Sequence, residues 1–165
     1  MRNKLLYRVI VPLLFGLLTG GCTTTPVFKT SGVDPTLTPQ QVLAEPASSL
    51  GKTVLWGGTI LDTRNLKDAT RIEILAYPLD SSHWPAQEDQ PLGRFIIEHP
   101  GYLEPTSYAQ GRVLTVLGRV GNSQSGKVGE SEYTYPLIIA EQLHLWPRDS
   151  RQSNTRFHLG IGIGL

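Results

Sequence analysis

The sequence predicts an all-β domain, a five-stranded antiparallel barrel with one short helix between strands 3 and 4. Five runs rich in β-branched and aromatic residues follow one another between Lys52 and Trp146, separated by polar, glycine-rich or proline-rich stretches. The gap of residues 99–111, "HPGYLEPTSYAQG", leaves room for a short helix. Three strands, a helix and two strands is the order of an OB-like barrel. A looser β-sandwich or half-barrel is the alternative.

The first three predicted strands cover residues 52–62, 70–77 and 92–98. The second alternates apolar and polar side chains, which is the period of a strand with one face in water. Its apolar side is Ile72, Ile74 and Ala76, and its other side is Arg71, Glu73 and Tyr77.

The fourth and fifth predicted strands cover residues 112–120 and 132–146. Pro136 interrupts the fifth, so we expect an edge or a bulge there, because proline has no N–H for the ladder. Between these strands, "GNSQSGKVGES" is expected to form a hairpin loop.

Residues 1–21 have the features of an export signal. Arg2, Lys4 and Arg8 precede an uncharged run from Val9 to Leu18, and small residues follow. A membrane-spanning helix is the alternative, but it needs about 20 apolar residues, and this run is shorter and contains Pro12.

Cys22 is the single cysteine, so no internal disulfide can form. The sequence "LTGGC" resembles the lipobox of bacterial lipoproteins, with Thr19 where that pattern prefers leucine. The resemblance implies cleavage before Cys22 and acylation of its thiol, so Cys22 is the expected lipid attachment residue. Ordinary cleavage near Gly21, leaving a free thiol, is the alternative. In such lipoproteins an Asp after the cysteine favours the inner membrane, so Thr23 implies the outer membrane.

The mature chain is long enough for one small domain. We expect a lipidated tether over residues 22–49, the barrel over 50–147 and a tail over 148–165. The tether is rich in Thr, Pro and Ser, which suits a spacer. Within it, "TPQQVLA" could form one helical turn with Thr38 as cap and Pro39 at its first position.

Charge and motifs argue against several classes of function. The whole chain carries +1, and removing residues 1–21 removes three basic residues and no acidic one, which leaves −2. That is unfavourable for nucleic acid, whose binding uses Lys and Arg. "GNSQSGKV" nearly matches a phosphate loop, but it ends in Val128 and lies between strands, where no helix N-terminus faces an anion.

The sequence predicts no enzyme, cofactor or metal site. There is no G-x-S-x-G motif, and the histidines have no metal-like spacing. Glu73 and Glu141 could form a glycosidase pair if the fold brought them together. The histidines are His83, His99, His144 and His158.

Aromatic residues mark the predicted strand ends and loops. OB-like faces use such residues to hold sugars or bases, although packing in the core is expected for most of them. They are Trp56, Tyr77, Trp84, Tyr102, Tyr108, Tyr133, Tyr135 and Trp146.

A set of short motifs is spaced along the chain: "WGGTI", "TRIEILAYPLD", "GRF", "GYLEPTSY", "VLTVLGRV", "YTYPLI" and "LHLWP". From the lipobox through Pro147, this set resembles the Slp family, starvation-inducible outer-membrane lipoproteins of Gram-negative bacteria. The resemblance implies a lipid-anchored, non-enzymatic envelope component linked to starvation or stationary phase, facing the periplasm, with Cys22 as its acylated residue. A module that binds glycan or an envelope protein, and a periplasmic hydrolase, are the alternatives.

The tail ends in "RFHLGIGIGL", where apolar residues alternate with glycine and His158. This is a strand period, so the tail could pair with a barrel edge or a partner. A frayed terminus is the alternative.

Overall fold

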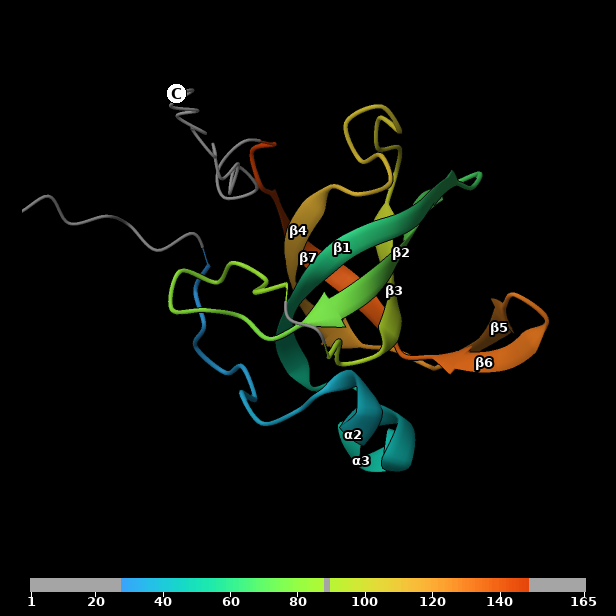
Figure 1. Ribbon diagram of the computed structural model, residues 1–165. Coiled ribbons are helices and arrows are strands. Elements are labelled where there is room, and N and C mark those ends of the chain that lie inside the picture. The colour runs from blue at the N-terminus through green and yellow to red at the C-terminus, as the bar shows by residue number, and fades with distance from the viewer. Residues whose placement is uncertain (1–27, 88–89, 149–165) are drawn as a thin grey trace, which may run out of the picture.

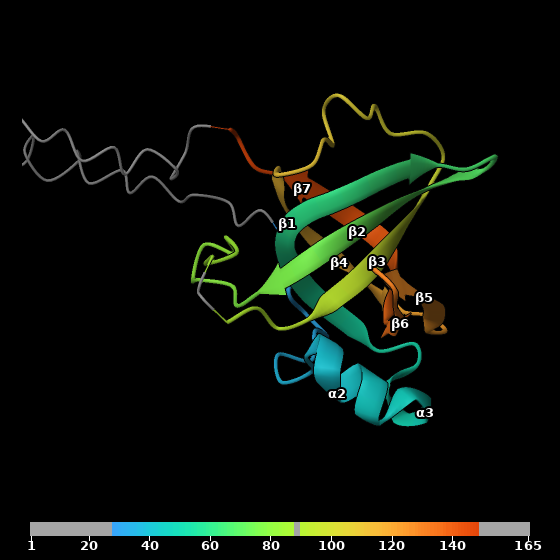
Figure 2. The same cartoon turned by 45° about the vertical axis from the view of Figure 1, so that its right-hand side comes forward.

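A computed structural model describes residues 28–87 and 90–148, and it confirms the five-stranded OB-like barrel (Figures 1 and 2). The signal segment, Cys22 and the tail hypothesis for residues 157–165 lie outside the described residues. The barrel closes in the order β1-β2-β3-β7-β4. Its strands are β1 (Thr53–Asn65), β2 (Ala69–Tyr77), β3 (Arg94–Pro100), β4 (Val113–Val120) and β7 (Leu137–Leu145).

One pairing in the barrel is parallel, which corrects the fully antiparallel prediction. β3 and β7 run in the same direction through the pair Ile97 and Ile138, whereas the other neighbouring strands are antiparallel. The reason is topological. Strand direction cannot alternate all the way round a closed ring with an odd number of strands.

The predicted fifth strand is divided at Pro136. Its first part is β6 (Ser131–Tyr135), which pairs with β5 (Gln124–Val128), and its second part is β7 in the barrel. The hairpin expected at "GNSQSGKVGES" is therefore present, and it extends from the barrel in Figure 1. Gly129 lies in its turn with a φ of 60°.

The short helix expected between strands 3 and 4 is absent from residues 101–112, so its predicted place was wrong. This stretch makes separate hydrogen-bonded turns: the N–H of Tyr108 donates to the carbonyl of Glu104 at 3.1 Å, and the N–H of Arg112 donates to the carbonyl of Ala109 at 3.1 Å. Gly111 then takes a φ of 82°, which ends any helical course. Leu103 and Tyr108 pack against the core from this stretch.

Two short helices precede β1 instead: α2 (Pro39–Ala44) and α3 (Pro46–Ser49). The helical turn predicted at "TPQQVLA" is confirmed. Thr38 caps it through its hydroxyl, which accepts from the N–H of Gln41 at 3.3 Å, while the Gln41 side chain accepts from the N–H of Thr38 at 2.6 Å. Val42 of α2 packs in the core cluster, so α2 covers one end of the barrel.

The barrel interior is aliphatic with two large rings. The alternation predicted for β2 is confirmed, because Ile72, Ile74 and Ala76 are buried. Trp56 and Phe95 meet edge to face at 5.2 Å between ring centroids. The remaining members of the buried cluster are Val42, Val54, Ile60, Ile97, Leu114, Val116, Val120 and Ile138.

Two glycines lie at the middle of β1, where it pairs with a strand on each side. Gly57 pairs with Tyr77 of β2 and Thr115 of β4, and Gly58 pairs with the next residues of both strands. A Cβ on Gly58 would collide with the backbone carbonyl of Leu75. Glycine therefore permits a backbone approach that no other residue allows.

Gly58→Val should lower the free energy of unfolding by about 3 kcal/mol or more, because the added side chain must displace backbone in a closed sheet. Urea denaturation of a soluble form that begins at Thr23 measures this. Gly126→Val is the matched control: a Cβ there meets the ring of Tyr135 at 2.9 Å, on the projecting hairpin, and the loss should stay near 1 kcal/mol. Equal losses would contradict the close-approach explanation.

Candidate functional site

The segment before α2, residues 28–38, is fastened along one side of the barrel; we call it the leading segment. Phe28 is buried and lies edge to face between His83 and His144, with ring centroids 5.9 and 6.2 Å away. The N–H of Asp34 donates to the carbonyl of Thr53 at 3.0 Å. The structure therefore places part of the predicted tether in direct contact with the domain.

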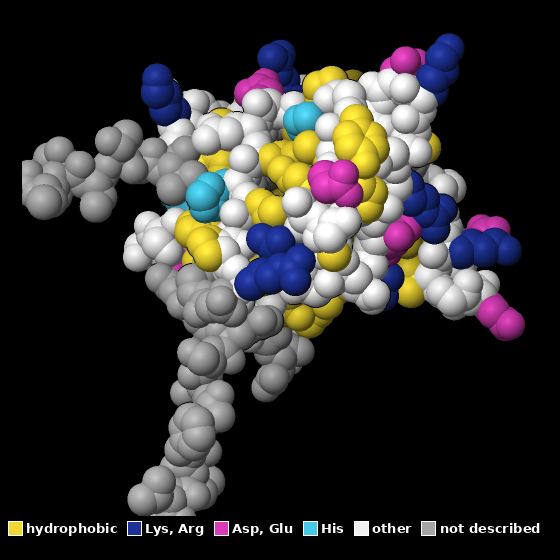
Figure 3. Space-filling view, turned by 90° about the horizontal axis from the view of Figure 1, so that it is seen from above, with side chains coloured by type: hydrophobic (Ala, Val, Ile, Leu, Met, Phe, Trp, Pro, Cys, Tyr) yellow, Lys and Arg dark blue, Asp and Glu magenta, His cyan; other side chains and the backbone are white. Residues whose placement is uncertain are grey.

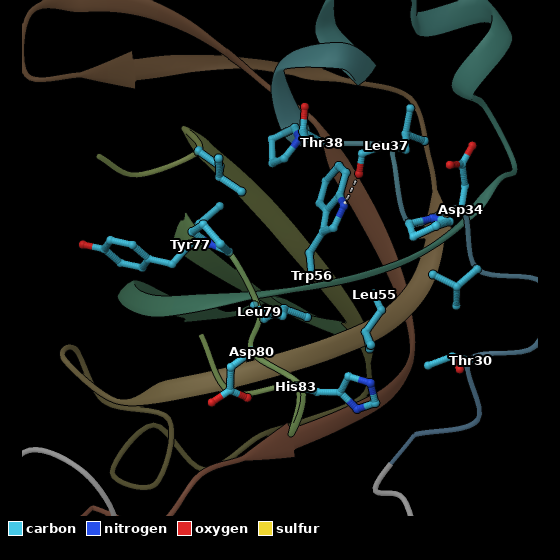
Figure 4. A pocket seen from close by; sticks show the side chains of 17 residues that line it. Thr30, Asp34, Leu37, Thr38, Leu55, Trp56, Tyr77, Leu79, Asp80 and His83 are labelled. Carbon is cyan, nitrogen blue, oxygen red and sulfur yellow. Dashed lines mark hydrogen bonds between the residues drawn. The ribbon is translucent and has the colours of Figure 1, made fainter. Parts of the chain in front are cut away.

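Between the leading segment, the start of β1 and the β2–β3 loop lies a cavity of 540 Å³, here called the end pocket (Figure 4). Trp56 lies near its middle, with Leu37 and Thr38 on one side and Leu79, Asp80 and His83 on the other. The indole N–H of Trp56 donates to the carbonyl of Leu37 at 2.8 Å. This bond ties the barrel core to the leading segment at the pocket wall.

The lining of the end pocket is mostly apolar, and much of it is half-buried rather than buried. Asp34 and Asp80 are its carboxylates, and it contains no Lys or Arg. Hydrogen bonds from Thr36 hold the pKa of Asp34 below its usual value, so this carboxylate stays charged near neutral pH. The apolar lining residues are Val33, Pro35, Leu37, Pro39, Leu55, Trp56, Ala76, Pro78, Leu79 and Leu92.

Asp80 shapes the loop that closes the pocket. Its side chain accepts from the N–H of Ser82 at 2.8 Å and from the N–H of Trp84 at 3.1 Å, which turns the chain back on itself. His83 at this turn has a φ of 65°, and its carbonyl accepts from the Thr115 hydroxyl at 2.8 Å. The loop is thereby attached to β4.

An aromatic cluster lies next to the pocket. Trp84 and Trp146 meet edge to face at 5.1 Å, and His144 approaches Trp146 to 4.3 Å. Burial lowers the pKa of His144, which favours the neutral ring beside Phe28. The packing role expected for most aromatic residues therefore describes Trp56, Trp84 and Trp146.

The outer face of β2 and β3 carries paired charges. Arg71 and Glu98 lie 2.9 Å apart, and Arg94 and Glu73 lie 2.8 Å apart. The Tyr135 hydroxyl donates to Glu73 at 3.2 Å, and burial, followed by the Glu73 charge, raises the pKa of Tyr135. The outer face of β2 and β3 is therefore covered by ion pairs between neighbouring strands rather than by aromatic side chains.

The two carboxylates singled out in the sequence have different partners. Glu73 pairs with Arg94 of β3, whereas Glu141 pairs with Arg119 of β4 at 2.6 Å. Glu73 lies on β2 and Glu141 on β7, which are not neighbours in the barrel, so the two carboxylates belong to separate ion pairs and do not form a glycosidase pair. Within residues 28–87 and 90–148, no three His, Asp or Glu side chains form a group that could hold a metal ion.

The charges do not gather into a basic patch on the face that Figure 3 shows, where acidic and basic side chains are interspersed. A polyanion would have to displace the glutamates that neutralise Arg71 and Arg94. In the described part of the chain, no helix has the length and apolar character needed to cross a bilayer.

Sequence reasoning identified Trp56 but missed most of the end pocket. Val33, Asp34 and Leu37 lie in a stretch whose composition suggests a spacer, and the lining residues from Pro78 to His83 lie between predicted strands. The available signal was Phe28, because one large apolar residue in a polar stretch suggests a packing contact. Cys22, the predicted lipid attachment residue, lies outside the described residues.

The chain is similar to three curated bacterial proteins. It is 38% identical over 96 residues to an uncharacterized protein of Haemophilus influenzae (58% of this chain, 52% of the relative). It is 29% identical to the uncharacterized lipoprotein YeaY of Escherichia coli (80% and 68%) and 28% identical to the outer membrane protein Slp of the same organism (62% and 54%). The matches therefore span about half the length of two of these relatives.

Among solved structures, the barrel is similar to the small single-stranded DNA-binding protein of Streptomyces coelicolor. The TM-score is 0.39 and the identity 15%, with 58% of this chain and 94% of that one covered.

The model of the outer membrane lipoprotein Slp family matches residues 19–161. The match begins within the lipobox-like sequence and passes Pro147, so it extends into the tail, beyond the motifs that suggested the family. With most of its length matched, the chain belongs to the outer membrane lipoprotein Slp family.

Proposed function

We propose that this protein is a non-enzymatic component of the outer membrane, anchored through acylated Cys22 and acting in starvation or stationary phase. One observation carries the proposal: the lone cysteine follows an export-like segment and precedes the buried Phe28 by only six residues. Acyl chains at Cys22 would hold the domain at the membrane without a spanning segment. Family membership supports this anchoring and the outer-membrane location.

The short distance between Cys22 and Phe28 supports a domain held against the membrane surface rather than above it. The tether predicted for residues 22–49 would then be confined to the residues before Phe28. In this arrangement the barrel faces the periplasm. The non-enzymatic part of the proposal is supported by the arginine pairing of Glu73 and Glu141.

A second candidate function, a binding module, is favoured by the end pocket. A volume of 540 Å³ falls within the range of about 300–1,000 Å³ that small-molecule sites occupy. The pocket offers a ligand half-buried apolar side chains, whereas the β2–β3 face carries paired charges.

Cys22→Ser should abolish incorporation of labelled palmitate and leave the signal segment attached, because serine offers no thiol for acylation. Gel autoradiography of the protein from labelled cells measures both effects. Thr24→Ser is the control, since it adds a serine nearby and keeps the thiol. Equal labelling of the Cys22 variant and the wild type would refute anchoring at this residue.

Thr23→Asp should move the protein toward the inner membrane, because an acidic residue after the lipidated cysteine favours retention there. Density-gradient fractionation of the two membranes measures the shift, with Thr23→Ser as control. Wild-type protein already sedimenting with the inner membrane would contradict the sorting argument.

A strain without this protein should lose viability faster in prolonged stationary phase than its parent. The wild-type chain should restore survival, and the Cys22→Ser chain should not, because the unprocessed chain without acyl groups would not be delivered to the outer membrane. Colony counts over several days measure this. Identical survival of all strains would show that the protein does not contribute to survival during starvation.

A further inference from the structure

The position of Phe28 limits how far the end pocket can lie from the membrane. Six residue steps separate Phe28 from Cys22, and an extended chain covers at most about 3.5 Å per residue, or about 21 Å in all. Phe28 is buried against His83, which itself lines the end pocket. With Cys22 acylated, this end of the barrel is therefore next to the lipid head groups.

The pocket wall suits an alkyl chain. Val33 and Leu37 of the leading segment, Leu55 of β1, and Leu79 and Leu92 of the β2–β3 loop line it, and each is half-buried. Because these side chains still expose apolar surface, a chain of methylenes that covers it gains about 0.8 kcal/mol for each buried group. The indole N–H of Trp56 is already bonded to Leu37 and is not offered to a sugar.

We infer that the end pocket receives one acyl chain of an ethanolamine-headed lipid from the adjacent bilayer. The inference rests on the proposed anchoring at Cys22. The protein's own acyl chains are a poorer source, because stable anchoring requires two or more chains to remain in the membrane. The lining holds Asp34 and Asp80 and no Lys or Arg, and one cation outside it, Lys52, pairs with Asp34 at 3.6 Å. The two carboxylates outnumber this ammonium, which favours the cationic head of an ethanolamine lipid over an anionic head.

The test uses the full mature lipoprotein, purified from cells and reconstituted into vesicles of phosphatidylethanolamine and phosphatidylglycerol. The vesicles contain lysophosphatidylethanolamine whose palmitoyl chain ends in a photoreactive diazirine. The protein's own chains carry no diazirine, so only bilayer lipid can crosslink. After illumination, mass spectrometry should find the label on peptides covering residues 30–39, 53–57 or 76–92.

Two variants from different elements test the pocket. Leu79→Arg and Val33→Arg should each lower the crosslink yield about tenfold, because an unpaired charge in an apolar site is strongly disfavoured. Leu66→Arg is the matched control. Leu66 is 47% exposed at the turn between β1 and β2, at the opposite end of these strands from Tyr77, and its replacement should leave the yield unchanged. Circular dichroism verifies that each variant is folded.

Flotation of the same vesicles distinguishes a failure of the proposed anchor at Cys22 from a failure of the proposed lipid site. Protein that floats with the vesicles but is labelled equally in all three variants, or only outside the pocket peptides, overturns the lipid site and leaves the anchor intact. Protein that does not float overturns the anchor and the lipid site with it. Protection of the pocket peptides from hydrogen exchange by soluble peptidoglycan fragments, without lipid crosslinks, would assign the pocket to glycan and also overturn the inference.

Discussion

The structure depends on the close approach of three backbones at Gly57 and Gly58. β1 must pair with β2 and β4 at the same residues if five strands are to close, and a Cβ on either glycine would collide with a neighbouring strand. Next to these glycines, Trp56 is buried in the core against Phe95, whereas Leu55 is half-buried and lines the end pocket. The same two glycines therefore permit barrel closure and position one wall of the end pocket.

The leading segment is packed on this end of the barrel. Two hydrogen bonds join it to β1, from Trp56 to Leu37 and from Asp34 to Thr53. Phe28 adds about 1.5–3 kcal/mol if its side chain is fully buried only in the folded state. Five residues, 23–27, separate the proposed anchor at Cys22 from this first packed side chain.

Charge pairing makes the β2–β3 face a stable surface with little attraction for an ionic ligand. Arg71 and Arg94 each have a glutamate across the strands, so neither offers a free cation to phosphate or nucleic acid. Half-buried leucine and valine side chains line the end pocket instead. The likeness to an OB barrel thus describes the path of the chain, while the distribution of charge and apolar surface belongs to this protein.

The sequence by itself determined the five strands, the interruption at Pro136, the capped turn at Thr38 and the family. These features rest on local periodicity, on proline and capping chemistry, and on short spaced motifs. Only the tertiary structure decided which strands are parallel, that no helix forms between β3 and β4, and how the end pocket is built. Those properties come from contacts between residues far apart in the chain, such as Phe28 with His144 and Leu37 with Trp56. The composition of residues 28–38 suggests a spacer. No local pattern in the sequence shows that these residues pack on the barrel, because that contact involves residues far away in the chain.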